Sequence, residues 1–310
     1  MITVLAGGVG AARFLEGLVS VVDPARVTVI SNVGDDEEFF GLHVSPDIDI
    51  VVYTLGGAVD ETKGWGLRDE GFACLERLGA LGHDTWFALG DRDLATHVHR
   101  TALLREGRTL SEATASVAQA FGVRCRLLPV TDDRLRTVVD TDAGMLSFQE
   151  YFVKRGWQDE VRAVRFDGVE AARPAPGVIQ AIREAEAVIV APSNPIVSIG
   201  PILAVSGVRE ALRETAAPVV AVSPIVGGRT LKGPADRMLR ALGHEPSPAA
   251  VAALYADFLD ALIVDRVDAH LCERVEAQGV RTVVADTVMR GPREKEALAR
   301  AALTAAGAIG

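Results

Sequence analysis

Glycines and aspartates gather directly after the first two apolar segments of this chain. Ile2–Ala6 runs into the loop Gly7-Gly8-Val9-Gly10-Ala11-Ala12-Arg13, and Arg26–Ile30 runs into Ser31-Asn32-Val33-Gly34-Asp35-Asp36. Glycines after a strand let backbone N–H groups approach a phosphate at the positive end of a helix. Nearby carboxylates supply the oxygen ligands that Mg²⁺ prefers. The sequence therefore indicates metal-assisted chemistry on a nucleotide or a phosphate ester.

The glycine loop by itself leaves two interpretations open. Gly8-Val9-Gly10 matches the beginning of the dinucleotide-binding fingerprint, but Arg13 stands where the third glycine of that fingerprint belongs. An NAD(P)-dependent oxidoreductase is therefore an alternative function. In the interpretation that we favour, Gly8, Gly10 and Arg13 cradle the phosphates of a donor nucleotide.

A second group of carboxylates follows in Ser45-Pro46-Asp47-Ile48-Asp49. If this segment is extended, residues two apart share a face, so Asp47 and Asp49 would reach one cation. A metal ion would relieve the repulsion between two such carboxylates. We predict Asp49 as the principal Mg²⁺ ligand, with Asp35 and Asp47 assisting. Helix capping or solvation explains Asp36 equally well.

Two carboxylates, a guanidinium and an imidazole follow the apolar run Trp86–Leu89 in Gly90-Asp91-Arg92-Asp93-Leu94-Ala95-Thr96-His97. Ligands of open α/β sheets sit beyond the carboxyl ends of strands. A functional interpretation of this loop is favoured, because functional residues concentrate on loops that rigid strands hold. In the structural alternative, Asp91 caps the next helix and Arg92 pairs with a surface acid.

Two further segments are candidate binding loops. Ala191–Pro201 follows another apolar run, and three prolines hold it extended, so Ser193, Asn194 and Ser198 would be presented rigidly to a base, ribose or phosphate. Trp65 stands between two glycines and is a candidate platform for a flat ring. Core packing is the alternative for Trp65, and a simple turn is the alternative for the proline loop.

Composition excludes several classes of protein. The chain has 310 residues, of which 49% are hydrophobic, and a formal net charge of −10, which argues against a nucleic-acid partner. It has no apolar run long enough for a membrane span, and its apolar start is better interpreted as a buried strand than as a secretion signal. The three cysteines show no metal spacing, so we expect reduced thiols in a cytoplasmic protein.

Short apolar runs alternate with helical patterns along most of the chain. This alternation predicts an α/β fold, a doubly wound, mostly parallel, Rossmann-like sheet. We expect one domain over residues 1–310, with a small antiparallel or helical lobe inserted at about 130–170. Helical patterns include Pro248–Leu262, and the predicted strands are Thr3–Ala6, Val27–Ser31, Trp86–Leu89, Ala187–Ala191, Val219–Val222 and Thr282–Ala285.

These motifs occur together in one known family. The sequence resembles 2-phospho-L-lactate transferase, including its actinobacterial relatives that use a phosphoenolpyruvyl donor. The matching stretches run in order from residue 7 to 236 and are GGVGAARFLEGL, NVGDD, SPDID, GDRDLATH, LLPVTDD, FQEYFV, APSNPIVSIGPI, VSPIVGG and GPAD. Together they are specific, whereas none of them is specific alone.

The resemblance implies a Mg²⁺-dependent transferase of coenzyme F420 biosynthesis. In that reaction a guanosine diphosphate (GDP) ester of a three-carbon acid gives the acid's phosphate ester to the terminal ribityl hydroxyl of the deazaflavin Fo, and GMP leaves. The Asp91–His97 loop would then orient Fo and its attacking hydroxyl, with Asp91 or Asp93 as the base and Arg92 neutralising charge at the reacting phosphate. Asp91, His97 and Trp65 would bind Fo, and the family suggests a homodimer. A non-catalytic nucleotide-binding regulator is a further alternative, since a more distant family shares the glycine-rich opening. The sequence does not identify the acid.

Overall fold

The computed structural model describes residues 1–309 and is built on one seven-stranded parallel sheet. The first strand lies inside the sheet, between strands from the N-terminal half of the chain on one side and strands from the C-terminal half on the other. In spatial order the strands are β14 (Arg281–Ala285), β13 (Ala261–Asp265), β10 (Val219–Val222), β9 (Ala187–Val190), β1 (Ile2–Ala6), β2 (Val27–Ser31) and β5 (Arg126–Pro129). This is the doubly wound, Rossmann-like arrangement that the sequence predicts.

The inner strands are buried along their whole length because helices cover both faces of the sheet. All residues of β1, β2, β9, β10 and β13 are buried, as expected of parallel strands that have helices on each side. Thr3 of β1 lies opposite Thr28 of β2 on one side and opposite Val188 of β9 on the other.

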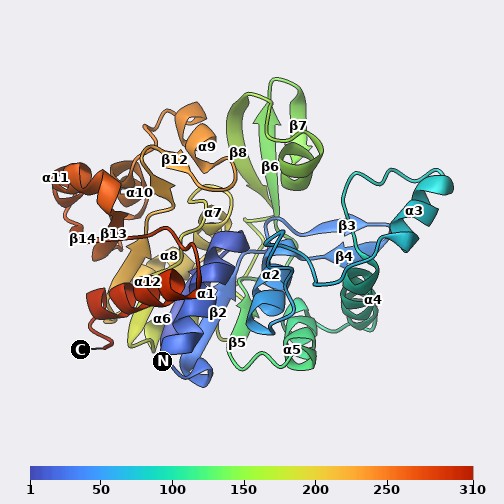
Figure 1. The fold of residues 1–310 in the computed structure, drawn as a ribbon, viewed down its shortest axis with the longest axis horizontal. Coiled ribbons are helices and arrows are strands. Elements are labelled where there is room, and N and C mark those ends of the chain that lie inside the picture. Colours follow the sequence, from blue (N-terminus) through green and yellow to red (C-terminus); the bar gives the residue numbers. More distant parts are fainter. Residues whose placement is uncertain (310) are drawn as a thin grey trace.

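Helices cover the two faces of the sheet in two layers (Figure 1). On the near face α1 (Gly8–Val21) packs between α2 (Pro46–Leu55) and α12 (Pro292–Ala305), whereas α6 (Val178–Arg183) and α8 (Val208–Glu214) pack together on the far face. The α1–α12 contact is close, because a Cβ atom built on Gly17 would lie 2.3 Å from the carbonyl oxygen of Lys295. No helix among residues 1–309 has the length and apolar character needed to cross a membrane.

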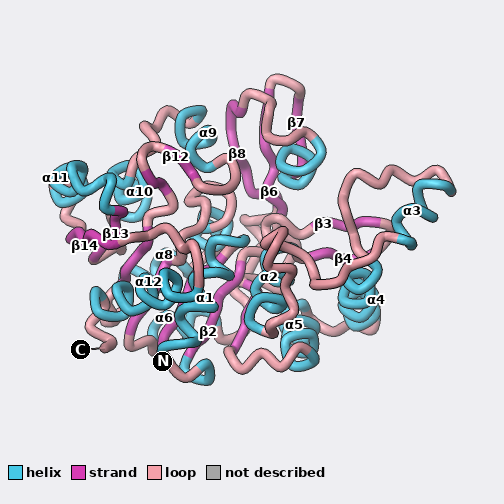
Figure 2. Tube along the Cα trace, in the orientation of Figure 1, coloured by secondary structure: helices cyan, strands magenta, loops and turns pink. Residues whose placement is uncertain are grey.

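The chain between α2 and β5 makes a long excursion away from the sheet. It contains a mostly irregular segment, residues 56–72, and Figure 2 shows this loop reaching outward beside the hairpin of β3 (Glu37–Phe39) and β4 (Leu42–Val44). The helices that follow it are α3 (Ala73–Ala80), α4 (Asp91–Arg105) and α5 (Leu110–Ala120).

Two of the predicted elements are wrong. Trp86–Leu89 is a loop, because its aromatic rings leave the sheet and pack on Phe39, with Phe87 stacked at 4.2 Å between ring centroids. The helix predicted for Pro248–Leu262 ends at Tyr255, and Ala261–Asp265 forms β13. Both errors involve four or five apolar residues, a length at which periodicity does not separate strand from helix or loop.

A small antiparallel sheet forms the lobe predicted in the middle of the chain. β6 (Arg136–Thr141) pairs with β7 (Gly144–Ser147) on one side and with β8 (Val161–Asp167) on the other. The remaining elements are a β11–β12 hairpin (Ile225–Val226 and Arg229–Thr230), helices α7 (Ile199–Ala204), α9 (Ala235–Ala241), α10 (Pro248–Tyr255) and α11 (Cys272–Glu276), 3₁₀ turns at Pro24–Arg26 and Arg266–Leu271, and a π-helical turn at Glu150–Lys154.

The close contact of α1 with α12 gives a test of the packing. We expect Gly17→Ala to lower the free energy of unfolding by about 1–3 kcal/mol, because the new methyl group would meet the α12 backbone. The control is Gly79→Ala in α3, where the nearest atom would be 3.6 Å away and removal of a helical glycine should raise stability by about 0.5–1 kcal/mol. Urea titrations measure both. Equal stability of the two variants would contradict the α1–α12 contact.

Candidate active site

The order of the strands marks the place for a ligand. Strand order reverses between β1 and β9, and ligands of such sheets bind in the crevice beyond the carboxyl ends of the two strands at that point. The loops that reach this crevice follow β1 and β9. They are two of the loops that the sequence selected, and the structure brings them together: the N–H of Gly7 donates to the Ser193 hydroxyl at 3.4 Å.

Gly8 and Gly10 of the first loop are required for different structural reasons. Gly8 has a φ of +72° and begins α1, and the nearest atom to a Cβ built there is Asp47 Oδ1 at 3.6 Å. Gly10 lies against the other loop, since its Cβ would be 2.2 Å from the carbonyl oxygen of Pro192. Gly10 is therefore needed for packing between the loops, whereas Gly8 and the uncapped start of α1 face the crevice as an anion site.

The other polar residues predicted for nucleotide binding also differ in their surroundings: two lie beside the glycine loop, and two bind backbone groups of other segments. Ser193 and Ser198 are buried beside the glycine loop, and a Cβ on Gly7 would lie 2.7 Å from the Cβ of Ser198. Asn194 instead fixes its own loop, because its side-chain oxygen accepts from Ile196 N at 2.9 Å. Arg13 donates to the carbonyl oxygen of Met289, in the loop after β14.

Asp47 and Asp49 do not share a face, and the premise of an extended segment is wrong. Pro46 is the first residue of α2, where proline is favoured, so both aspartates lie in the first helical turn. Residues two apart on a helix point in nearly opposite directions. Asp47 accepts from Asn32 Nδ2 at 2.9 Å beside the glycine loop, whereas both oxygens of Asp49 accept from the guanidinium of Arg100.

Asp35 and Asp47 form a strained pair of buried carboxyl groups. Burial raises the pKa of Asp35 well above its ordinary value, and the charges of Asp47 and Asp36 raise it further. Burial also raises the pKa of Asp47, to about 7, although its hydrogen bond from Asn32 opposes the shift. Oδ1 of Asp35 is buried and has no hydrogen-bond partner. Burial raises the pKa of Asp36 as well, and its Oδ1 also has no hydrogen-bond partner, but His43 and Ser45 bind its Oδ2 at 2.9 and 2.7 Å.

This pair suits a magnesium ion only in part. Carboxylate oxygens that repel each other, one of them without a partner, are the environment that a hard cation relieves. Within the described part of the chain, no group of three or more His, Cys, Asp or Glu side chains is arranged to hold a metal. Mg²⁺ commonly uses one or two carboxylates together with phosphate oxygens of the substrate. The structure therefore fits a metal that is completed by a bound nucleotide.

Behind this crevice, α2 and α4 are joined by a buried polar network. Arg100 is fully buried on α4 and holds Asp49, and His97 lies between Asp49 and Asp93, with Nε2 3.2 Å from Asp93 Oδ2 and Nδ1 3.8 Å from Asp49 Oδ2. The hydroxyl of Tyr53 donates to Asp93 at 2.5 Å. Burial opposes ionisation of Asp93, but hydrogen bonds from His97 and Tyr53 hold its pKa below the ordinary value.

Two members of this network were missed by the sequence analysis. Arg100 and Tyr53 lie within helices that carry predicted site residues, at the spacing of one helical face: Arg100 is three residues after His97, and Tyr53 is four residues after Asp49. That spacing was the available signal.

Asp91 and Arg92 do not face the crevice. The carboxylate of Asp91 accepts from the backbone N–H groups of Ala73 and Cys74 at 3.1 and 2.9 Å and so caps α3. The guanidinium of Arg92 donates to the carbonyl oxygen of Arg68 at 3.0 Å on the outer side of α4. The structural alternative is met only in part: Asp91 caps the preceding helix α3 and not the next one, and Arg92 lies 3.9 Å from the surface acid Asp69.

Trp65 lies near Asp93 although 27 residues separate them in the sequence. Both line a small cavity together with Lys63, Glu70, Phe72 and Gly90, among others. The indole is 46% exposed, and the ammonium group of Lys63 lies 5.8 Å from its centroid. Of the residues predicted to bind the acceptor, the structure thus groups Trp65, Asp93 and His97 and leaves out Asp91.

Comparison with known proteins decides the family. The model of the family 2-phospho-L-lactate transferase CofD matches residues 2–303. The chain belongs to the 2-phospho-L-lactate transferase family. This membership makes it a transferase of the phosphoenolpyruvate and phospholactate type and implies a role in F420 biosynthesis.

Curated members of the 2-phospho-L-lactate transferase family align over nearly the whole chain. A phosphoenolpyruvate transferase of Streptomyces griseus is 48% identical, covering 97% of both chains. A 2-phospho-L-lactate transferase of Methanopyrus kandleri is 42% identical, covering 97% of this chain and 96% of its own. A solved structure from Bacillus halodurans matches in fold, with a TM-score of 0.66, 17% identity and coverage of 97% and 98%. The homodimer and the cytoplasmic location stay predictions.

The Asp49–Arg100 ion pair predicts a large loss of stability when it is broken. Asp49→Asn leaves a fully buried guanidinium without its counter-charge, so we expect a loss of about 3–5 kcal/mol in urea unfolding of metal-free protein. The control is Glu214→Gln, which breaks an exposed pair with Arg183 and should cost less than about 1 kcal/mol. If Asp49 were chiefly a metal ligand, its variant would unfold like the wild type without metal.

The raised pKa of Asp47 predicts a pH dependence of the metal-free protein. Because the folded pKa is about 7 and the ordinary value is 3.8, the folded state holds this proton more tightly, so its contribution to stability falls as pH rises between those values. Asp47→Asn removes this term. We expect the variant to gain stability over the wild type as pH rises from about 4 to about 7. A difference that does not change with pH would contradict the raised pKa.

Proposed function

We propose that this protein transfers the phosphate ester of a three-carbon acid from a GDP ester to the terminal ribityl hydroxyl of the deazaflavin Fo. GMP leaves, and the product is a phosphodiester of the F420-0 type. The observation that carries this proposal is the Asp35–Asp47 pair beside Gly8, at the start of α1 and at the reversal of strand order. It supplies a place for donor phosphates next to a place for Mg²⁺.

The donor side of the crevice is built to hold phosphates in line. Backbone N–H groups at the start of α1 would bind the diphosphate, Ser193 and Ser198 would border it, and Asp35 and Asp47 would hold Mg²⁺. Bound Mg²⁺ would neutralise the charge that develops on the phosphate oxygens. The loops that carry Lys63 and Lys232 are in contact, because a Cβ atom built on Gly64, next to Lys63, would lie 3.0 Å from Lys232 Nζ.

The acceptor side requires orientation more than a strong base. In a loose phosphoryl-transfer transition state the proton of the attacking hydroxyl leaves late, so a carboxylate of low pKa is adequate. Asp93 meets this requirement, and Tyr53 and His97 hold its carboxylate in place. Trp65, in the same small cavity, offers a flat apolar surface for the deazaflavin ring.

The relatives favour a phosphoenolpyruvyl donor over a phospholactyl one. The Streptomyces griseus relative at 48% identity is named for phosphoenolpyruvate, and the Methanopyrus kandleri relative at 42% for phospholactate. Mass analysis of the product made from each GDP ester with Fo distinguishes the two, because the phosphoenolpyruvyl product is lighter by two hydrogens. Turnover of the phospholactyl ester alone would overturn this choice of donor.

The oxidoreductase alternative has little support at the crevice. Gly10 packs on Pro192, and two buried carboxyl groups would oppose a dinucleotide pyrophosphate that arrived without a metal. A regulator without catalysis would bind GDP but show no product.

The metal assignment gives a direct test of the reaction. We expect Asp35→Asn and Asp47→Asn to lower single-turnover transfer at saturating donor and Fo by at least about a hundredfold, because the metal supplies several kcal/mol of transition-state stabilisation. Both variants should also lose the Mg²⁺-dependent part of GDP binding in calorimetry. The control is Asp23→Asn, an exposed carboxylate at the opposite end of the sheet. Transfer at the wild-type rate in both variants would remove this pair from the reaction.

A further inference from the structure

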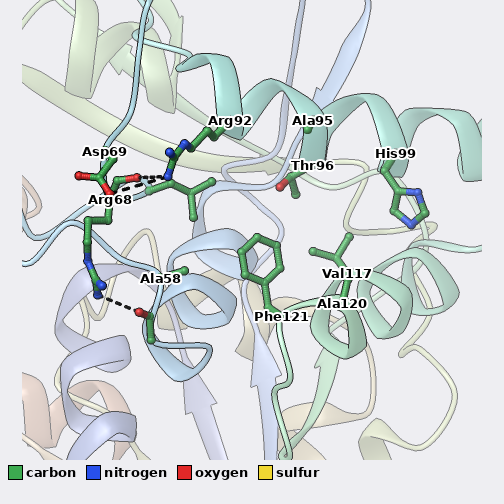
Figure 3. A pocket seen from close by; sticks show the side chains of 12 residues that line it. Ala58, Arg68, Asp69, Arg92, Ala95, Thr96, His99, Val117, Ala120 and Phe121 are labelled. Atoms are coloured by element: carbon green, nitrogen blue, oxygen red, sulfur yellow. Dashed lines mark hydrogen bonds and ion pairs between the residues drawn. The ribbon is translucent and has the colours of Figure 1, made fainter.

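A groove on the outer side of α4 has no part in the proposed reaction. It lies between residues 57–69, α4 and α5 and has a volume of about 600 Å³ (Figure 3). Its apolar wall includes Leu67, Ala95, Val117 and Phe121, and Arg68 and Arg92 stand at one end of it. This size and this mostly apolar lining with a few polar groups are typical of small-molecule sites in proteins.

The groove is separate from the crevice. Asp47 lies in the first turn of α2, whereas Gly57, which lines the groove, follows the end of that helix, and a ten-residue helix is about 15 Å long. α4 also divides the two, since Arg92, Ala95 and His99 face the groove whereas Asp93, His97 and Arg100 belong to the buried network behind the crevice. A ligand in the groove would therefore leave the crevice open.

The apolar wall favours a flat ring. Phe121 is held in place by the ring of Tyr53, at 5.1 Å between centroids, and in Figure 3 its ring stands in the space beside Val117. Ala95 and Ala120 have only methyl groups at the wall, so a planar ligand has room over Phe121. Offset or edge contacts with an aromatic side chain add to the burial of such a ring.

The cationic end favours an acid. Arg92 lies at this end with an exposed side chain, and its guanidinium contacts the carbonyl oxygen of Arg68 at 3.0 Å and the carboxylate of Asp69 at 3.9 Å. Arg68 donates to the carbonyl oxygen of Gly57 at 2.8 Å, so its guanidinium points away from that of Arg92 at the same end (Figure 3). Among the described residues, Asp69 has the only carboxylate within 4 Å of either guanidinium, although the carboxylate of Glu70 accepts from the backbone N–H groups of Arg92 and Asp93 nearby. The guanidinium of Arg92 therefore keeps N–H donors for an acid. A planar anion such as a carboxylate matches a guanidinium in geometry.

We propose that this groove binds a small aromatic acid, with the ring over Phe121 and Val117 and the acid group on Arg92. The site does not depend on the identity of the transfer reaction. Thr96 links it to the acceptor side, because it lines the groove and precedes His97, whose Nε2 lies 3.2 Å from Asp93 Oδ2.

Calorimetry of the full-length protein with two naphthalene derivatives tests the charge and the ring separately. We expect 2-naphthoate to bind about tenfold or more tightly than the uncharged 2-naphthalenemethanol, because a hydrogen bond between a guanidinium and a carboxylate is stronger than one to a neutral hydroxyl. Arg92→Gln should reduce the affinity for 2-naphthoate to that of the alcohol. Equal affinity of the two compounds for the wild type would overturn the proposal.

Filling the groove gives a matched pair of variants. Ala120→Trp places an indole in the groove and should abolish binding of 2-naphthoate, whereas Val98→Trp adds the same side chain to an exposed position of α4 outside the groove and should leave binding unchanged. Amide chemical shifts of the wild type with 2-naphthoate give a measurement that needs no variant. Shifts at Arg92, Ala120 and Phe121 support the site, and shifts confined to Gly8 and Ser193 would place the acid in the crevice instead.

Discussion

The geometry of the crevice depends on one buried ion pair, Asp49 with Arg100. A fully buried guanidinium is tolerated only with a counter-charge in good geometry, so the pair fixes the first turn of α2 against α4. That turn also carries Asp47, which the pair thereby directs at Gly8 and Asn32. The same arginine borders His97 and, through it, Asp93. One interaction outside the crevice thus sets the positions of groups on its donor and acceptor sides.

The crevice combines opposing charges that a substrate complex would balance. The start of α1 attracts anions, whereas Asp35 and Asp47 repel them and each other. A phosphate alone or a metal alone would satisfy half of this arrangement. A nucleotide bound together with Mg²⁺ satisfies both halves, and this mutual requirement is physically consistent with substitution at phosphorus in a family of phosphoenolpyruvate and phospholactate transferases.

Local patterns predicted the sheet and the glycine loop because their causes are local. Buried β-branched runs form β1, β2, β9 and β10, and the need for glycine at Gly8 follows from its positive φ. The prediction for Asp49 as the principal metal ligand rested on an extended segment, and a helix that begins at Pro46 instead points it at Arg100. Asp91 was a candidate catalytic residue in the sequence analysis, because residue spacing does not reveal its partners. These partners are the backbone N–H groups at the start of α3.

The sequence by itself determined the class of fold, the family and the chemistry of the loops, because strand burial, glycine conformation and the order of motifs are properties of short segments. Tertiary structure decided which carboxylates meet. Asp35 and Asp47 come from different elements, and Arg100 reaches Asp49 across 51 positions. A side chain's direction depends on the phase of its helix and on what packs against it, so the division of the aspartates into a buried carboxyl pair, an ion pair and a helix cap appeared only in the folded chain.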